Sequence, residues 1–261
     1  MRIARVAVDR QPAFAVVDGP LDAPLDELDV LPLAQHPLLG LKPTGERVSL
    51  ASVRLLAPVV PSKVVGIGKN YADHATEMGG QVPEEPLVFL KPSTAVVGPD
   101  DPVVLPAGVG RVDHEAELAV VMGALARRVR AEEALATVWG YTCANDVTAR
   151  ELQARDGQWA RAKGFDSFCP LGPWVETSLD PADVGVRCTV DGDVRQDGRT
   201  ADLVHAVASL VEAVSRVMTL LPGDVILTGT PAGIGPLVAG QQVSVEVEGV
   251  GVLTNPVMDE T

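Results

Sequence analysis

The sequence predicts an α+β protein with a mixed, rolled β-sheet. Short apolar runs typical of strands outnumber the helical segments and alternate irregularly with them, and the turns between them are rich in Gly and Pro, of which the chain has 25 and 21. Apolar residues make up 46% of the 261 residues, which suffices for a large core. A doubly wound parallel sheet would instead require a regular alternation of strands and helices.

The first 60 residues are expected to form a small N-terminal domain. Residues 2–8 and 13–17 are short apolar runs around Asp9-Arg10-Gln11-Pro12, and they predict a β-hairpin. Residues 18–61 are rich in Pro, Asp and Leu and show weak periodicity, and Ala57-Pro58-Val59-Val60-Pro61-Ser62 marks the expected boundary. Residues 61–261 are then expected to form the larger domain.

The larger domain is expected to contain short strands and several helices. Strands are predicted at residues 64–67, 87–90, 103–105, 117–122, 188–190 with 194, 225–227, 243–247 and 250–253. Helices are predicted at residues 71–78, 131–138, 148–155 and 202–220. The last helix has the clearest pattern, an apolar stripe made of Leu203, Val207, Leu210, Val211, Val214 and Val217.

Charge and composition exclude several classes of function. Lys plus Arg total 21 and Asp plus Glu total 35, so the net charge is −14 and nucleic acid is not an expected partner. The first residues lack the apolar stretch of a signal peptide, and no apolar run approaches the roughly 18 residues of a membrane span. Cys143, Cys169 and Cys188 show no CxxC spacing and are expected to be reduced core residues, which suits the cytoplasm.

Several common catalytic motifs are absent from the sequence. Gly66-Ile67-Gly68 lacks the third glycine of a dinucleotide-binding loop, and the chain contains neither GxxxxGK[ST] nor GxSxG. With four histidines and no paired cysteines, a zinc site is disfavoured.

Two glutamates spaced two residues apart form the candidate metal site. Glu115 and Glu117 enter a predicted strand, so their side chains point to one face while His114 points to the other. Adjacent carboxylates repel unless a cation lies between them, and carboxylate oxygens suit Mg²⁺ or Mn²⁺. Asp146, where an apolar strand ends and a helix is expected to begin, would be the third ligand. The spacing leaves open a solvated Glu-x-Glu face and a helix-capping Asp.

His74 and Glu77 form the candidate acid–base pair. They are three residues apart in a predicted helix, and are therefore neighbours on its surface. A carboxylate that orients an imidazole produces a general base able to activate water. The alternative that remains open is an ordinary exposed His–Glu pair.

Further polar residues follow the third carboxylate and are candidates for substrate binding. Arg150 and Gln153 lie about one helical turn apart, so they can face the same site. A cation beside a metal, such as Lys163, is typical of a clamp for a substrate carboxylate, although a surface charge is the alternative. Arg161 is expected to be a surface charge.

The loop after the strand predicted at 225–227 is a candidate anion-binding loop. Its sequence, Thr228-Gly229-Thr230-Pro231-Ala232-Gly233, offers hydroxyls and backbone N–H groups that could hold an anion. A plain loop is the alternative.

Several short blocks of the chain become recognisable when they are taken together. They are Gly66-Ile67-Gly68-Lys69-Asn70-Tyr71-Ala72-Asp73-His74, Phe89-Leu90-Lys91-Pro92-Ser93, His114-Glu115-Ala116-Glu117-Leu118, Asn145-Asp146-Val147-Thr148-Ala149-Arg150, Lys163-Gly164-Phe165-Asp166 and Leu227-Thr228-Gly229-Thr230-Pro231. In this order, over residues 64–256, they resemble the catalytic domain of the fumarylacetoacetate hydrolase family. The N-terminal segment resembles the one found in a branch of acylpyruvase, oxaloacetate decarboxylase and hydroxyhepta-diene-dioate isomerase-like members.

The resemblance implies a fold, a cofactor and roles for particular residues. It implies a mixed β-sandwich roll that is usually dimeric and uses Mg²⁺ or Mn²⁺. The implied metal ligands are Glu115, Glu117 and Asp146, in agreement with the spacing argument. His74 and Glu77 would lie on a lid and handle a proton or water. The pocket for a small 2-oxo acid would be lined by Arg150, Gln153, Lys163 and Thr230.

The resemblance also implies the chemistry, in the setting of aromatic catabolism. A metal would chelate a 2-oxo carboxylate through one carboxylate oxygen and the keto oxygen, and would stabilise the enolate left when the neighbouring C–C bond breaks. Attack by water makes the enzyme an acylpyruvate hydrolase, and loss of CO₂ makes it an oxaloacetate decarboxylase. Residues 229–233 differ from the corresponding loop of the longer enzymes that cleave fumarylacetoacetate, so that compound is not the expected substrate.

Three other functions remain open from the sequence. The first is an isomerase of the 2-hydroxyhepta-2,4-diene-1,7-dioate or 5-carboxymethyl-2-hydroxymuconate type, which needs only proton transfer. The second is a sugar-acid dehydratase, whose reaction also depends on stabilising an enolate. The third is a catalytically silent module that binds a metal or a carboxylate, and the retention of both glutamates and of the His74–Glu77 pair argues against it.

Overall fold

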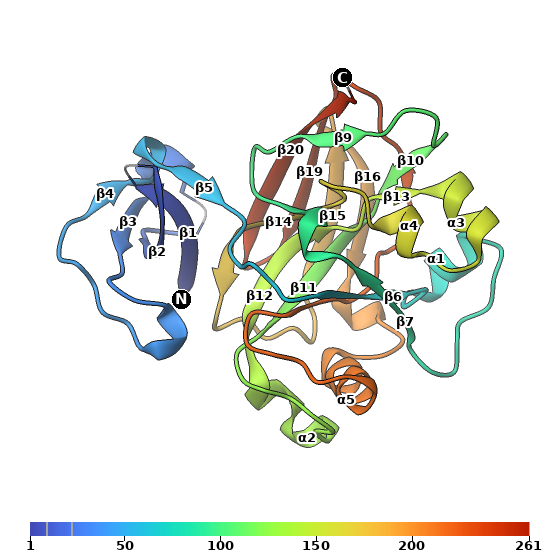
Figure 1. Ribbon diagram of the computed structural model, residues 1–261, viewed down its shortest axis with the longest axis horizontal. Helices are drawn as coiled ribbons and strands as arrows, with labels where there is room; N and C mark the ends of the chain where they lie inside the picture. The colour runs from blue at the N-terminus through green and yellow to red at the C-terminus, as the bar shows by residue number, and fades with distance from the viewer. Residues whose placement is uncertain (9, 22, 261) are drawn as a thin grey trace.

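The strands of the molecule assemble into large mixed sheets with few helices. The computed structural model describes residues 1–261 except Asp9, Asp22 and Thr261. Within the described residues, the strands form one sheet of 12, one of 5 and one of 3, which confirms the predicted α+β class and rolled mixed sheet. Figure 1 shows strands β1–β5 as a separate lobe on the left and the helices around the larger lobe on the right.

The strands and helices have the following bounds. The N-terminal strands are β1 Arg2–Val8, β2 Gln11–Asp18, β3 Asp29–Pro32, β4 Val48–Ser49 and β5 Arg54–Leu56. The large sheet continues with β6 Val64–Gly68, β7 Leu87–Lys91, β8 Val96–Val97, β11 Ala116–Met122, β12 Val138–Asn145, β14 Cys169–Glu176 and β17 Val225–Leu227. The five-stranded sheet contains β9 Val103–Leu105, β15 Gly185–Val190, β16 Asp193–Arg199, β19 Gln242–Val247 and β20 Gly251–Asp259. The small sheet contains β10 Val112–His114, β13 Thr148–Ala149 and β18 Gly235–Pro236. The α-helices are α1 Ala72–Glu77, α2 Ala131–Ala134, α3 Arg150–Asp156, α4 Ala160–Lys163 and α5 Val207–Val217.

The large sheet runs without a break from the N-terminal lobe into the rest of the chain. Its order is β4-β3-β2-β1-β14-β12-β11-β17-β6-β7. The predicted N-terminal hairpin is confirmed as the antiparallel pair β1–β2, and β1 also pairs with β14 through Arg2 opposite Glu176 and Ile3 opposite Val175. The division into domains of residues 1–60 and 61–261 stays a prediction.

Strand β11 is buried on both faces, and this arrangement determines where the candidate site lies. Leu118 and Val120 belong to the main core, where β11 packs against β15 and β19 of the five-stranded sheet. Ala119 and Val121 belong to a second apolar cluster on the opposite face. Because side chains alternate along a strand, Glu117 faces the side of Ala119 and Val121, away from the core between the two sheets.

The last predicted helix is shorter than its apolar pattern indicates. The sequence predicts a helix over 202–220, whereas α5 covers Val207–Val217. Before it, the backbone of Val204 and His205 is bonded to Asn70 at 2.9 and 2.8 Å, which holds this segment outside the helix. These bonds to a residue far away in the chain override the local helical preference. The expected stripe is buried from position 207 to position 214, whereas Val217 is 71% exposed.

Two other predicted helices also lose residues to strands. The helix predicted at 131–138 ends as α2 at Ala134, after which residues 135–137 form a 3-10 turn and residue 138 begins β12. The helix predicted at 148–155 begins only at Arg150, because Thr148 and Ala149 pair with β10 as strand β13. In both cases pairing with a distant strand decides the boundary, and an amphipathic pattern does not contain that information.

The cysteines behave as the sequence predicts. Cys143, Cys169 and Cys188 are free and buried. Burial raises the pKa of the Cys143 thiol to about 12, so this side chain is an inert part of the core. Among the described residues, no helix has the length and apolar character required to cross a membrane.

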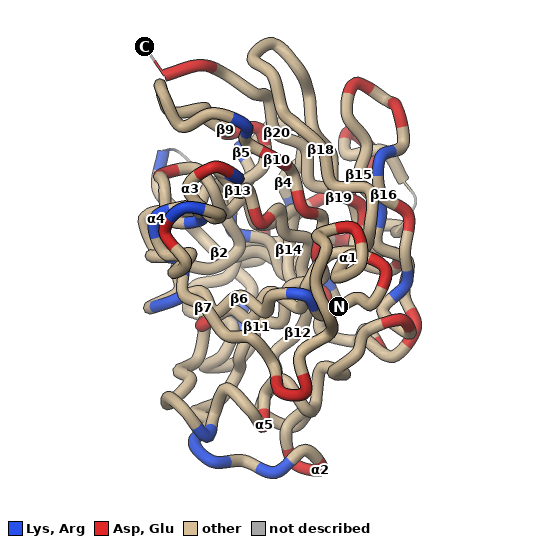
Figure 2. Tube along the Cα trace, turned by 90° about the vertical axis from the view of Figure 1, so that its right-hand side faces the viewer, with Lys and Arg blue, Asp and Glu red and all other residues tan. Residues whose placement is uncertain are grey.

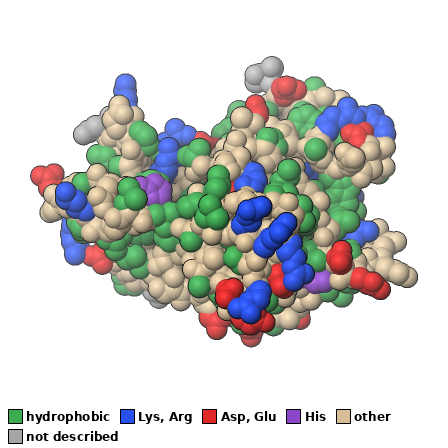
Figure 3. Space-filling model, turned by 60° about the horizontal axis from the view of Figure 1, so that its bottom comes forward, with side chains coloured by type: hydrophobic (Ala, Val, Ile, Leu, Met, Phe, Trp, Pro, Cys, Tyr) green, Lys and Arg blue, Asp and Glu red, His purple; other side chains and the backbone are tan. Residues whose placement is uncertain are grey.

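Charged residues are distributed over the whole surface. Figure 2 shows Asp and Glu on loops and strand ends throughout the trace, with fewer Lys and Arg between them. The face in Figure 3 carries basic, acidic and apolar side chains close together. The net charge of −14 is therefore spread over the molecule.

Candidate active site

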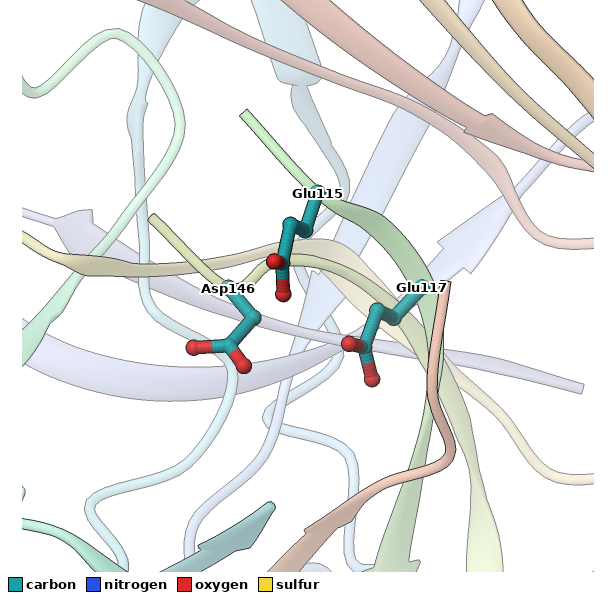
Figure 4. A group of neighbouring side chains, drawn as sticks. All are labelled: Glu115, Glu117 and Asp146. Carbon is teal, nitrogen blue, oxygen red and sulfur yellow. The ribbon is translucent and has the colours of Figure 1, made fainter. Parts of the chain in front are cut away.

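The three predicted metal ligands lie together in the folded chain. One carboxylate oxygen from each of Glu115, Glu117 and Asp146 lies within 4.8 Å of the others, and all three residues are buried. Figure 4 shows the three carboxylates facing a common space. The antiparallel pairing of β11 and β12 places Ala116 opposite Asn145, and the backbone N–H of Asp146 donates to the carbonyl of Glu115 at 2.9 Å. Strand register therefore brings the third carboxylate to the other two.

The charges around this triad fit a divalent cation. Burial opposes the charged form of Glu115, yet Lys163 and Arg150 hold its pKa well below the usual range. Glu117 makes no ion pair among the described residues, and its Oε2 accepts a hydrogen bond from the N–H of Gly229 at 2.6 Å. Burial, together with the other two carboxylates, raises the pKa of Glu117 well above its usual value. A dication bound to oxygens of all three residues would remove this repulsion, so the site fits Mg²⁺ or Mn²⁺.

Lys163 lies inside the carboxylate cluster. From the end of α4, its Nζ donates to Glu115 Oε2 at 2.9 Å and to Asp146 Oδ2 at 2.6 Å. A third bond goes to Thr148 Oγ1 at 2.7 Å. Lys163 therefore holds two of the proposed metal ligands, and its role as a clamp for a substrate carboxylate stays a prediction. Arg161 is exposed and pairs with a surface carboxylate, so it is the surface charge that was expected.

Lys91 is a residue of the site for which the sequence interpretation has no role. It is fully buried at the end of β7, and its Nζ donates to Asp146 Oδ1 and, at 3.3 Å, to the carbonyl of Val147. The available signal is that this lysine directly follows four apolar residues of a predicted strand. Long cations are seldom fully buried without a partner, so such a position indicates a buried carboxylate nearby.

Arg150 connects the triad to a further buried acid, Asp113. Its Nε donates to Asp113 Oδ2 at 2.8 Å, and its Nη1 donates to Gln153 Oε1 at 2.9 Å, so the predicted pair of Arg150 and Gln153 does meet. Nη2 lies 2.6 Å from Glu115 Oε1. Arg111 binds the same aspartate through both carboxylate oxygens, at 2.6 and 3.0 Å. Asp113, which has no role in the sequence interpretation, thus positions both arginines.

His74 and Glu77 meet on helix α1 beside the triad. His74 Nδ1 lies 3.3 Å from Glu77 Oε2, and His74 is only 6% exposed. The burial of the imidazole argues against an ordinary exposed histidine, whereas Glu77 itself is exposed. Glu77 also accepts a hydrogen bond from the backbone N–H of Gly233 at 3.1 Å, which ties α1 to the loop of residues 228–233.

The loop of residues 228–233 binds carboxylates of the chain itself. Its N–H groups at Gly229 and Gly233 donate to Glu117 and Glu77, respectively. The Thr230 hydroxyl donates to the carbonyl of Ala116 at 2.8 Å. The loop therefore orients one proposed metal ligand and one member of the acid–base pair.

Gln196 of β16 holds this loop against the strand that carries the glutamates. Its Oε1 accepts from the N–H of Ala116 at 2.9 Å and lies 3.1 Å from His114 Nδ1. Its Nε2 donates to Thr230 Oγ1 and to the carbonyl of Pro231, both at 2.7 Å. His114 thus points away from the triad, as strand alternation predicts. No local sequence pattern identifies Gln196 as a residue of the site, because its side-chain partners lie 34 to 82 residues away in the chain.

All predicted site residues line one cavity of about 660 Å³. They are His74, Glu77, Glu115, Glu117, Asp146, Arg150, Gln153, Lys163 and Thr230. The cavity also has apolar walls, formed by Ile67, Met78, Phe89, Trp159 and Ile234. A small polar centre with apolar walls is typical of a site for a small organic molecule, and the individual roles of these residues stay predictions.

The fold and the site together define an enzyme class in which an acidic triad and a His–Glu pair share one cavity. The chain belongs to the fumarylacetoacetate hydrolase family: residues 63–258 match the family described as "Fumarylacetoacetate (FAA) hydrolase C-terminal". Residues 1–58 match a second family, described as "Rv2993c-like, N-terminal". The family resemblance predicted from the sequence is thereby confirmed.

Relatives of known sequence cover most of the chain. Protein Rv2993c of Mycobacterium tuberculosis is 52% identical over 99% of this chain and 98% of its own length. A mitochondrial oxaloacetate tautomerase of Xenopus laevis, fahd2, is 42% identical over 81% of this chain and 70% of its own length.

Solved structures resemble the whole chain. A 5-carboxymethyl-2-hydroxymuconate delta-isomerase from Mycobacterium smegmatis is 50% identical, with a TM-score of 0.92 and full coverage of both chains. A maleylpyruvate hydrolase from Sphingobium sp. SYK-6, in complex with manganese(II) ion and pyruvate, is 34% identical, with a TM-score of 0.81 and full coverage of both chains. The mixed β-sandwich roll implied by the resemblance is thus confirmed, and similar proteins include hydrolases, isomerases and tautomerases.

Proposed function

We propose that this chain is a divalent-metal-dependent enzyme that binds a 2-oxo carboxylate or dicarboxylate and cleaves the C–C bond next to the 2-oxo acid through an enolate. The observation that carries the proposal is the buried triad of Glu115, Glu117 and Asp146 in one cavity with the His74–Glu77 pair. The similar maleylpyruvate hydrolase, described with manganese(II) ion and pyruvate, supports a divalent metal and a 2-oxo acid as ligands of a chain with this fold.

The triad would hold Mg²⁺ or Mn²⁺, and the cations around it prepare the site. When bound, the ion supplies a positive charge that lowers the energy of an enolate formed beside it. Lys163 holds Glu115 and Asp146 in position through charge-assisted hydrogen bonds, and it helps to lower the pKa of Glu115. Arg150 also lines the cavity, and its Nη2 is buried 2.6 Å from Glu115 Oε1. As a cation on the cavity wall, Arg150 is the residue that we propose to attract the carboxylate of a substrate.

The His74–Glu77 pair would move the proton. Because Nδ1 of His74 faces Glu77, its Nε2 is the nitrogen left to accept a proton. In hydrolysis, water adds to the distal carbonyl carbon of an acylpyruvate and gives its proton to His74. When the C–C bond breaks, its electron pair passes to the 2-oxo acid fragment as an enolate. Return of a proton to carbon then releases pyruvate, while Glu77 stabilises the transient imidazolium.

A second candidate function is isomerisation or keto–enol tautomerisation of a 2-oxo diacid. It is supported by the 50% identical structure described as a delta-isomerase and by the 42% identical oxaloacetate tautomerase. In this reaction a base removes a proton from one carbon of the substrate and returns it at another atom, without water attack. The same cavity and the same triad serve both reactions.

The proposed function can be tested with a small panel of substrates. The purified protein is incubated with Mg²⁺ or Mn²⁺ and with acylpyruvates, oxaloacetate or a hydroxymuconate-type diacid, while pyruvate, CO₂ and enol absorbance are followed. Pyruvate from an acylpyruvate supports hydrolysis, and pyruvate with CO₂ from oxaloacetate supports decarboxylation. Loss of enol absorbance without pyruvate supports the second candidate. If the protein binds metal and oxalate but turns over none of these compounds, it is a silent binding module and the proposal is wrong.

We also propose that the chain forms a homodimer. In the large sheet β7 is an edge strand, and its Leu87 and Leu90 are 38% and 44% exposed. An exposed apolar edge of this kind is typically covered by another chain. Light scattering at working concentration should give about twice the 27.3 kDa mass of the chain. A mass equal to that of one chain would contradict the prediction.

A further inference from the structure

Two aromatic rings form a wall of the cavity that the proposed chemistry does not use. Phe89 and Trp159 meet edge to face, with 5.4 Å between their ring centroids. Both rings lie directly over glycines of β6: a Cβ at Gly66 would lie 2.1 Å from the Phe89 ring, and a Cβ at Gly68 would lie 2.5 Å from the Trp159 ring. Any larger residue at these two positions would displace the rings, so the backbone of β6 is shaped to seat this wall.

The aromatic wall extends from the carboxylate triad to Lys69. At one end, Nζ of Lys163 lies 4.9 Å from the centroid of the Phe89 ring, and the same ammonium binds Glu115. At the other end, Trp159 packs on Gly68, which directly precedes Lys69. A ligand whose acidic end lies at the triad could therefore lay its chain along both rings toward Lys69.

Among the Lys and Arg residues that line the cavity, Lys69 is the one that pairs with no carboxylate of the described residues. Arg111, Arg150 and Lys163 also line the cavity, and each of them is paired with a buried acid. No hydrogen bond or ion pair to Lys69 Nζ occurs among the described residues. Its ammonium instead lies against the backbone of Gly80, where a Cβ would come within 2.5 Å.

The backbone at Lys69 is also unusual. Its φ angle is +56°, in the left-handed region that side chains other than glycine rarely adopt. The next residue, Asn70, holds the turn through side-chain bonds to the carbonyls of Thr228 and His205, at 2.8 and 3.0 Å. Lys69 thus has a strained backbone, lies in a turn that hydrogen bonds hold in place, and has an unpaired charge at the cavity. This combination is expected of a ligand-binding position.

We propose that Lys69 forms a second anion subsite, which binds the distal carboxylate of a 2-oxo or 2-enol dicarboxylate whose planar middle lies on Phe89 and Trp159. The inference rests on the proposed function, because it assumes that the 2-oxo acid end lies at the triad. A flat conjugated chain packs well on aromatic rings, and a charged end group pairs with the free ammonium. A monocarboxylate of the same length would leave Lys69 without its anion. The preferred substrates are therefore extended diacids rather than 2-oxo monoacids.

The inference can be tested by binding, without turnover. Isothermal titration of the Mn²⁺-loaded protein is carried out with oxalate, 2-oxoadipate and 2-oxohexanoate. The last two have the same length and differ in the distal carboxylate. The wild-type protein should bind 2-oxoadipate about 10- to 100-fold more tightly than 2-oxohexanoate, the range expected for one charge-assisted contact. Oxalate reports on the triad alone.

Variants of Lys69 keep the backbone while changing the charge. Lys69→Asn should lose most of the preference for the diacid, because asparagine tolerates a positive φ but provides no cation. Lys69→Arg should retain most of it. Trp159→Leu should weaken both six-carbon ligands to a similar degree. In all three variants the affinity for oxalate should equal that of the wild type. The matched control for the loss of one positive charge is Lys42→Asn, which replaces an exposed lysine of the N-terminal lobe.

The outcomes separate this inference from the proposed function. If the wild-type protein binds Mn²⁺ but not oxalate, the placement of the 2-oxo acid at the triad is wrong, and the proposed function fails with it. If oxalate binds normally but the wild type binds the diacid and the monoacid equally, only the Lys69 subsite is overturned. Loss of oxalate affinity in Lys69→Asn would also overturn it, since Lys69 would then act at the metal end of the cavity.

Discussion

Replacing Glu117 with alanine should abolish turnover and lower the affinity for Mn²⁺ by at least about 100-fold, because the remaining carboxylates cannot hold a dication well. Glu117 is the member of the triad without an ion pair among the described residues, so its charge is the one that a metal must neutralise. Titration calorimetry with Mn²⁺ and the activity on the best substrate of the panel would measure the two effects. Removing the metal with a chelator should abolish the activity of the wild type, and Mg²⁺ or Mn²⁺ should restore it.

Stability of the metal-free protein provides the control for this variant. Burial close to two other carboxylates raises the pKa of Glu117, so at neutral pH the metal-free fold must either keep a repelled charge or take up a proton, and removal of this side chain relieves that cost. The metal-free Glu117→Ala protein should therefore melt at or above the temperature of the metal-free wild type, which excludes unfolding as the cause of inactivity. Glu133→Ala, which removes an exposed carboxylate on α2, should leave activity and Mn²⁺ affinity unchanged. Full turnover of either protein in excess chelator would show that the metal assignment is wrong.

His74→Ala should lower the rate of acylpyruvate hydrolysis by about 10²–10⁴-fold, the usual contribution of a positioned base. The same variant should lose much less on oxaloacetate, because decarboxylation needs no activated water. The rate of the Glu77→Gln variant should lie between the rates of the wild type and of His74→Ala, since the substitution leaves the imidazole in place but no longer supports its positive charge. Rates on both substrates at fixed Mg²⁺, with metal occupancy measured in each variant, would test the expectation.

The comparison of the two substrates distinguishes the roles of the His74–Glu77 pair. Glu77 accepts a hydrogen bond from the N–H of Gly233, so the pair also fastens α1 to the loop of residues 228–233. Equal losses on both substrates would show that the pair acts by ordering α1 over the cavity and not by activating water. Unchanged rates on both would remove His74 and Glu77 from the mechanism.

The parts of the molecule that the sequence predicts well are those that depend on neighbouring residues. The two-residue spacing of Glu115 and Glu117 suffices to place both side chains on one face of a strand. Hairpins such as β1–β2 and β15–β16 follow from apolar runs around a short turn. The order of the family blocks supports Asp146 as the third ligand and Arg150 as a pocket residue, for which spacing alone left alternatives open.

The remaining features depend on contacts between distant segments, which only the tertiary structure decided. Gln196 and Lys91 belong to the site because strand pairing brings β16 and β7 to it, and no local pattern records that pairing. Asn70 delays the start of the helix predicted at 202–220 by bonding to residue 205, in competition with a clear apolar stripe. Lys69 faces the cavity as an unpaired charge on a left-handed backbone, a state that the fold imposes against the preference of the residue. Local spacing thus determined which groups could do chemistry here. The tertiary structure determined which charges are neutralised and which one stays free, because the energy of a buried charge depends on every group that the fold packs against it.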